Sequence, residues 1–152
     1  MDIFEAIRKE DVQSIKEILA INPEVLGSID QRGSTPLILA TYYGNIDVTT
    51  AILEANPDVD KKDAAGNTAL MGVCFKGNLP IAQMLLDAGA DVNKTNMQGS
   101  SPLTFAATFG QKEMVQLLLA HGANKTIRDG RGMTAYDYAN TQGMREVAEL
   151  LK

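Results

Sequence analysis

Residues 30–44 read DQRGSTPLILATYYG, and the pattern of this stretch returns three more times along the 152-residue chain. Its first glycine, its threonine and its final glycine each recur every 33 residues. The recurring positions are Gly33, Gly66, Gly99 and Gly132; Thr35, Thr68, Ser101 and Thr134; and Gly44, Gly77, Gly110 and Gly143. A fixed period of this length predicts a stack of similar units, not a single compact core.

Each unit begins with signals for a tight turn and a short helix. Asp30 and Gly33 are typical of a turn, because glycine adopts backbone conformations that other residues avoid. Thr35 is a natural helix N-cap. Pro36 suits the first helical position, because the N–H that proline lacks would form no hydrogen bond within the helix there. The helix is expected to end near Gly44, which can take the left-handed conformation of a helix terminus.

A second helix follows in each unit. Apolar residues such as Ile81 and Leu85 recur there at helical spacing. This helix is expected to end at a left-handed residue, which is Gly89 or Gly122 in two units and Asn56 in another.

These motifs resemble the ankyrin repeat, a unit of about 33 residues with a hairpin and two antiparallel helices. The resemblance rests on Gly-Ser-Thr-Pro-Leu at residues 33–37 with Ala40 and Gly44, and on Leu-Leu-Asp-Ala-Gly-Ala-Asp-Val-Asn at residues 85–93. It covers essentially all of the chain. It implies an all-α ankyrin-repeat solenoid of stacked helix-turn-helix units joined by short hairpin loops.

We therefore expect a single domain over residues 1–152, divided into an N-terminal capping repeat (1–29), internal repeats (30–62, 63–95 and 96–128) and a C-terminal capping repeat (129–152). The first repeat matches least well, because Glu10 stands where later units have glycine and residues 22–29 contain one additional residue. The histidine that the family has after Thr-Pro-Leu is replaced by Ile38, Met71, Thr104 and Asp137. We expect the histidine network between repeats to be missing and stacking to contribute more of the stability.

Composition argues against several functional classes. The chain has 14 Lys and Arg against 19 Asp and Glu, a net charge of −5, which disfavours nucleic-acid binding. No stretch approaches the roughly 20 apolar residues that span a membrane, and the N-terminus lacks a secretory signal. One cysteine and one histidine exclude an intramolecular disulfide and a Cys/His zinc cluster confined to this chain. We expect a cytoplasmic protein.

No set of residues indicates an active site. Cys74 is expected to be a buried packing residue, and a catalytic thiolate there would need a cationic neighbour. His121 is expected to be solvated at the end of a helix. The glycines are explained by turns and helix ends, so no phosphate-cradling loop is indicated. The sequence thus predicts a non-enzymatic protein without cofactor or metal. The resemblance adds Asn93 as a position like those hydroxylated in some ankyrin repeats.

The resemblance also implies a binding surface, which we call the concave face. In this family it is lined by the hairpins and by the two residues before the glycine that ends each first helix. Candidate partner contacts in the hairpins are Arg32, Ser34, Lys62, Asn67, Met97, Gln98, Arg131 and Met133. Candidate contacts in the helix row are Arg8, Lys9, Tyr42, Tyr43, Phe75, Lys76, Thr108 and Phe109.

Nine more positions map to this face, which makes 25: Gln31, Ala64, Ala65, Thr95, Ser100, Arg128, Gly130, Thr141 and Gln142. The 25 positions hold seven basic residues, no acidic residue and four of the eight aromatic residues. Aromatic and arginine side chains often dominate binding energy at protein interfaces. We therefore expect a monomeric module that binds an acidic and apolar segment of another protein. Three alternatives stay open: Tyr42 and Phe75 pack between helices and serve the fold, the array is a spacer or regulatory subunit of a larger complex, or its basic face binds nucleic acid weakly.

Overall fold

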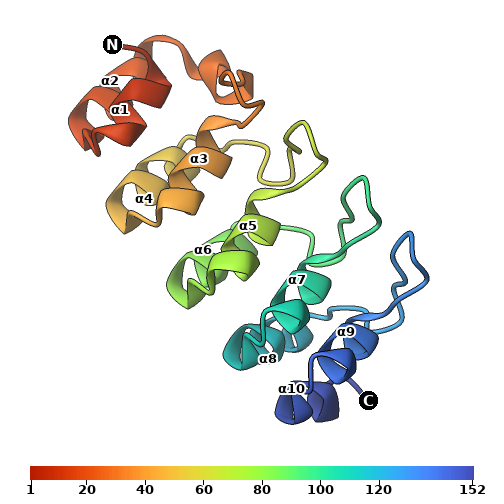
Figure 1. Cartoon of the computed structure of the whole chain (residues 1–152). Helices are drawn as coiled ribbons and strands as arrows, with labels where there is room; N and C mark the ends of the chain where they lie inside the picture. Colours follow the sequence, from red (N-terminus) through yellow and green to blue (C-terminus); the bar gives the residue numbers. More distant parts are fainter.

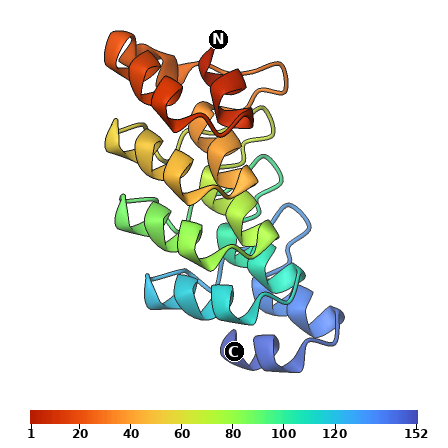
Figure 2. The same ribbon diagram turned by 90° about the vertical axis from the view of Figure 1, so that its left-hand side faces the viewer.

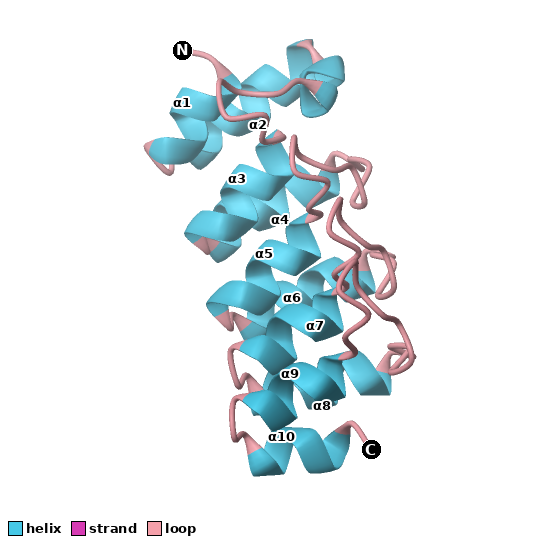
Figure 3. Cartoon of the chain, turned by 45° about the vertical axis from the view of Figure 1, so that its right-hand side comes forward, coloured by secondary structure: helices cyan, strands magenta, loops and turns pink.

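The computed structural model describes residues 1–152 and contains helices and loops but no strand, which confirms the expected all-α fold (Figure 3). Five antiparallel helix pairs are stacked in chain order from the N-terminus to the C-terminus (Figure 1). The first helices of the pairs are α1 (Ile3–Arg8), α3 (Pro36–Tyr43), α5 (Ala69–Lys76), α7 (Pro102–Thr108) and α9 (Ala135–Thr141). The second helices are α2 (Val12–Ile21), α4 (Ile46–Glu54), α6 (Leu79–Asp87), α8 (Lys112–Ala120) and α10 (Arg145–Leu150).

The two kinds of helix form two layers along the stack. Each first helix contacts the first helix of the next pair, and the hairpins all project from the same side of the stack (Figure 2). One apolar core of 30 buried residues runs through all five pairs, from Ile3 to Leu151. The core is therefore continuous along the stack, as nearest-neighbour packing of repeats requires.

The helix ends form as the sequence predicts. The hydroxyl of Thr35 accepts the N–H of Ile38 at 3.1 Å, and Thr68, Ser101 and Thr134 cap their helices in the same way. Asn56 has φ 56°, which confirms the left-handed conformation expected for it. Glu10 has φ 55° and so replaces the glycine that ends the first helix in the later pairs.

Residues that stand in place of the family's histidine contribute to these caps. The side chains of Met71, Thr104 and Asp137 each accept the backbone N–H of the residue that caps the same helix, at 3.4, 3.2 and 2.9 Å. Each pair of side chains thus satisfies two backbone N–H groups at the helix start. These bonds lie within one repeat, so the contacts between repeats depend on packing and on the hairpins.

The sequence did not predict the short 3-10 helix η1 (Pro23–Gly27), which follows α2. It occupies the stretch with the additional residue, and Pro23 stands at its first position. The ammonium of Lys61 donates to the carbonyl of Gly27 at 2.8 Å and so ties this helix to the next repeat. The first repeat therefore departs from the others in its link to the second repeat.

Neighbouring hairpins are joined by direct hydrogen bonds. The N–H of Met97 donates to the carbonyl of Ala65 at 3.2 Å, and the N–H of Gly130 donates to the carbonyl of Gln98 at 2.8 Å. Asn96 also donates its side-chain amide to Asn67 at 2.8 Å. These contacts fix the spacing of the hairpin tips along one edge of the stack.

Candidate functional site

A hollow of about 400 Å³ lies on the concave face between the second and third repeats, and we call it the central hollow. Helices α3, α5 and α7 and the hairpins of these two repeats supply its walls. Its lining residues are Asp30, Arg32, Ser34, Ile38, Leu39, Tyr42, Tyr43, Asp63, Asn67, Thr68, Met71, Gly72, Phe75 and Phe105. Six of the predicted contacts come together here: Arg32, Ser34, Tyr42, Tyr43, Asn67 and Phe75.

The predicted aromatic residues are partly exposed. The exposed fractions of Tyr42, Tyr43, Phe75 and Phe109 are 44%, 51%, 42% and 47%. The rings of Phe75 and Phe109 meet edge to face with their centroids 4.8 Å apart. These side chains therefore pack against neighbours and still offer about half of their surface to solvent.

Lys76 lies on the same row and covers one of these rings. Its ammonium is 4.6 Å from the centroid of the Tyr42 ring, which is within the range of a cation–π contact. The contact joins the second and third repeats and places positive charge at the rim of the aromatic row.

The two aspartates that line the central hollow are engaged by their own turns. One carboxylate oxygen of Asp30 accepts the N–H groups of Arg32 and Ser34, both at 2.9 Å. Asp63 accepts two N–H groups of its own turn in the same way. These carboxylates hold the hairpins in shape, and hydrogen bonds to a charged acceptor are among the stronger ones.

The predicted basic residues differ in the ion pairs and hydrogen bonds that their side chains form within the chain. Arg8 lies 3.7 Å from Asp30, Lys9 pairs with Glu5 at 3.6 Å, and Lys62 donates to the carbonyl of Thr95 at 2.7 Å. By contrast, the guanidinium groups of Arg32 and Arg131 form no ion pair and no hydrogen bond within the chain. Their guanidinium groups are therefore available to hydrogen-bond acceptors of a partner.

The remaining predicted contacts lie outside the central hollow. Met97 is 79% exposed on its hairpin, whereas Met133 is partly buried. Thr108 turns its hydroxyl back to the carbonyl of Thr104 at 2.7 Å. Gln98 and Arg131 line a second hollow of about 340 Å³ near the last hairpin.

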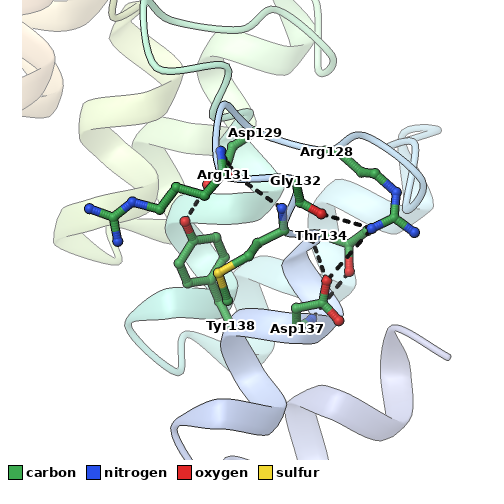
Figure 4. Close-up of polar contacts among 8 residues, drawn as sticks. Arg128, Asp129, Arg131, Gly132, Thr134, Asp137 and Tyr138 are labelled. Atoms are coloured by element: carbon green, nitrogen blue, oxygen red, sulfur yellow. Dashed lines mark hydrogen bonds and ion pairs between the residues drawn. The ribbon is translucent and has the colours of Figure 1, made fainter.

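The last hairpin carries its own polar network (Figure 4). The hydroxyl of Tyr138 donates to the carboxylate of Asp129. Burial acts to raise the pKa of Asp129, but this bond and the N–H groups of Met133 and Arg131 lower the pKa below its usual value. The same bond to Asp129 raises the pKa of Tyr138. Arg128 donates to the carbonyl of Gly132 at 2.8 Å on the other side of the turn.

Comparisons with known proteins agree with this architecture. The family described as "Ankyrin repeats (3 copies)" matches residues 3–96, and "Ankyrin repeats (many copies)" matches residues 85–139. The chain belongs to the ankyrin-repeat family. Ankyrin repeats generally serve as protein–protein interaction modules.

The curated relatives share an ankyrin-repeat segment with this chain. Ankyrin repeat and SAM domain-containing protein 6 is 38% identical over 63 residues in Mus musculus and 32% identical over 63 residues in Rattus norvegicus. Leucine-rich repeat serine/threonine-protein kinase 1 of Caenorhabditis elegans is 32% identical over 56 residues. The matches cover 41%, 41% and 37% of this chain, but only 7%, 7% and 2% of the relatives.

The structure also shows the surroundings of Cys74, His121 and Asn93. Cys74 is fully buried, and burial raises the pKa of its thiol. His121 is exposed at the end of α8, as expected. Asn93 accepts the N–H of Asn124 at 2.8 Å and so bonds to the following repeat.

No group of three or more His, Cys, Asp or Glu residues is placed to hold a metal ion. None of the helices has the length and apolar character for a membrane span.

Sequence reasoning missed the floor of the central hollow. Ile38, Leu39, Met71, Gly72 and Phe105 line it, although none of them was a candidate contact. A signal for this row does exist, because the ankyrin period places Gly72 where neighbouring repeats have large side chains. The row reads Leu39, Gly72, Phe105 and Tyr138.

Proposed function

We propose that the concave face of this ankyrin-repeat chain binds a segment of a partner protein that carries apolar and acidic residues. The observation that carries this proposal is the row of four half-exposed aromatic rings from α3, α5 and the C-terminal end of α7, three of which line the central hollow. The chain acts as a non-enzymatic, monomeric binding module, and residues 1–152 form one binding domain. One continuous core through all five helix pairs supports the single domain.

The aromatic rings would supply most of the affinity. Each buries a large apolar area when covered, and its rigidity keeps the loss of side-chain entropy small. Tyr43 and Phe109 stand at opposite ends of the exposed part of the row, in the second and fourth repeats. A bound segment that contacts both must cross the central hollow.

The charges would orient the segment. Arg32 lines the central hollow and Arg131 lines the hollow at the last hairpin. Neither guanidinium forms an ion pair or a hydrogen bond within the chain, although the charge of Arg131 acts on Asp129. Arginine can form two parallel hydrogen bonds with a carboxylate. Acidic side chains of the partner are therefore expected near both hairpins, where they would also speed association at low salt.

The test is a selection of random peptides displayed on phage, carried out with the wild-type protein as bait. Selected peptides are then titrated with wild type, with the Tyr43→Ala, Phe109→Ala double variant and with an Ile46→Ala control. Ile46 is 50% exposed, much like Tyr43, but it lies at the start of α4 and outside the central hollow. We expect the double variant to lose at least about tenfold in affinity, as removal of interface anchors does, and the control to bind as wild type.

Circular dichroism of each variant separates lost binding from lost folding. Two results would contradict the proposal: a selection that yields no peptide with apolar and acidic residues, or equal affinity of the double variant and the wild type with both folded.

A further inference from the structure

The glycine at position 72 opens the floor of the central hollow. In the adjacent repeats the same position holds Leu39 and Phe105, whose side chains line the hollow from either side. A Cβ atom placed on Gly72 would have one neighbour within 4 Å, the Cδ1 atom of Tyr42 at 4.0 Å. No side chain therefore crowds the Cβ position of the third repeat, where the neighbouring repeats carry a leucine or a phenylalanine.

The backbone does not require a glycine here. Gly72 lies inside α5, and it is not among the glycines with a left-handed conformation. Within a helix glycine is less favourable than alanine, because it has more conformational freedom to lose on folding. Neither the backbone conformation nor a close neighbour requires a glycine at position 72. What the glycine does is leave the space next to its Cα atom open on the side of the hollow.

The walls of this space are apolar, with charge at one side. Tyr42 and Phe75 are partly exposed residues of its lining, the buried Met71 also lines it, and Arg32 reaches the same hollow from the hairpin. Asp30 and Asp63 also line it, but the N–H groups of their own turns engage their carboxylates. Asp30 also lies 3.7 Å from Arg8, whereas the guanidinium of Arg32 forms no ion pair and no hydrogen bond within the chain.

We propose that the space at Gly72 is a specificity pocket for one leucine- or phenylalanine-sized side chain of the bound partner segment, with a carboxylate of the same segment on Arg32. This inference rests on the proposed function of the concave face. The size of the occupant follows from Leu39 and Phe105, which fill the equivalent positions. The acidic neighbour follows from charge complementarity with Arg32, whose guanidinium has no partner within the chain.

The test fills the pocket. Peptides selected on the wild-type protein are titrated with Gly72→Leu, which restores the side chain of the neighbouring repeats, and with Gly72→Ala, which adds one methyl group as a matched control. We expect Gly72→Leu to weaken binding at least tenfold and Gly72→Ala by less than threefold. Both variants are expected to melt at or above the wild-type temperature, since each replaces a helical glycine.

A second set of measurements identifies the two contacts. Replacing the peptide's apolar anchor by alanine should weaken binding to the wild type but leave binding to Gly72→Leu unchanged. Replacing the adjacent peptide carboxylate by its amide should weaken binding to the wild type but not to Arg32→Gln. If the peptide change weakens binding to the variant protein as much as it weakens binding to the wild type, the corresponding contact is overturned. This comparison holds even if a variant folds less well.

The outcomes separate this inference from the proposed function. Selected peptides that depend on Tyr43 and Phe109 but bind Gly72→Leu as tightly as wild type would overturn the pocket and leave the binding face in place. A selection that yields no peptide would overturn both. Self-association of the wild type that Gly72→Leu abolishes would identify a second copy of this chain as the occupant and so overturn the proposal.

Discussion

Phe75 and Phe109 meet edge to face, with their ring centroids 4.8 Å apart and their planes at 85°. The contact links α5 to the end of α7, and so the third repeat to the fourth. Each ring keeps more than two fifths of its surface exposed. The same two side chains thus stabilise the stack and remain available to a partner.

This pair should show energetic coupling in a double-mutant cycle. We expect Phe75→Ala and Phe109→Ala to interact by about 1 kcal/mol in the free energy of unfolding, because an aromatic pair contributes about that much beyond the area it buries. Urea unfolding of the wild type, both single variants and the double variant measures the coupling. Additive losses would show that the two rings touch without stabilising each other.

Gly66 and Gly132 allow the contacts between hairpins to be measured. Both glycines have a left-handed backbone, with φ of 80° and 78°, so alanine strains both to a similar extent, by about 1 kcal/mol. A Cβ atom on Gly66 would lie 2.9 Å from the backbone nitrogen of Met97, whereas one on Gly132 would have no neighbour within 4 Å. We expect Gly66→Ala to lower the melting temperature clearly more than Gly132→Ala. Equal losses would mean that the hairpins separate at little cost.

Thr49 offers a stabilising substitution. Its hydroxyl is fully buried in α4 and has no hydrogen-bond partner. Burying a hydroxyl without a partner costs free energy, so Thr49→Val should stabilise the protein by about 1 kcal/mol. Chemical denaturation measures the gain, with Thr50→Val as the control, because the hydroxyl of Thr50 donates to the carbonyl of Ile46 at 2.8 Å. A loss of stability in Thr49→Val would contradict the expectation.

Cys74 should react with thiol reagents only when the chain unfolds. Burial removes the side chain from solvent and raises the pKa of its thiol, so the nucleophilic thiolate is scarce at neutral pH. A colorimetric disulfide reagent should therefore label the native protein very slowly and the urea-unfolded protein at once. Rapid labelling of the native protein would revive a reactive role for this residue.

The bond between Tyr138 and Asp129 should make stability depend on pH. The pKa of Asp129 is lowered in the folded state, so its contribution is present above its ordinary value of 3.8 and is lost as the pH falls through the folded value. We expect Tyr138→Phe to destabilise the protein by about 1 kcal/mol at pH 7. The difference from wild type should shrink in strongly acidic solution, as followed by thermal melts across pH. A difference that does not change with pH would argue against the bond.

Much of the architecture could be predicted because it is local and repeated. Thr35 and Pro36 start a helix wherever the motif recurs, and the left-handed residue at the end of each helix follows from short-range backbone chemistry. Even the exceptions could be located: Asn56 lies 33 residues before Gly89, and Glu10 aligns with Gly44 once the additional residue in 22–29 is allowed for. The helix η1 escaped prediction because it lies where that period is broken.

The sequence alone determined the repeat and the approximate helix ends, because these depend on residue type and spacing, and the resemblance to ankyrin repeats supplied the candidate face. Only the tertiary structure decided what each side chain of that face does. It shows that Lys62 is engaged by the next hairpin while Arg32 has no partner, and that Gly72 leaves a space between two walls from other repeats. Such outcomes depend on distances between residues 33 or more positions apart, which the stacking of one repeat on the next sets.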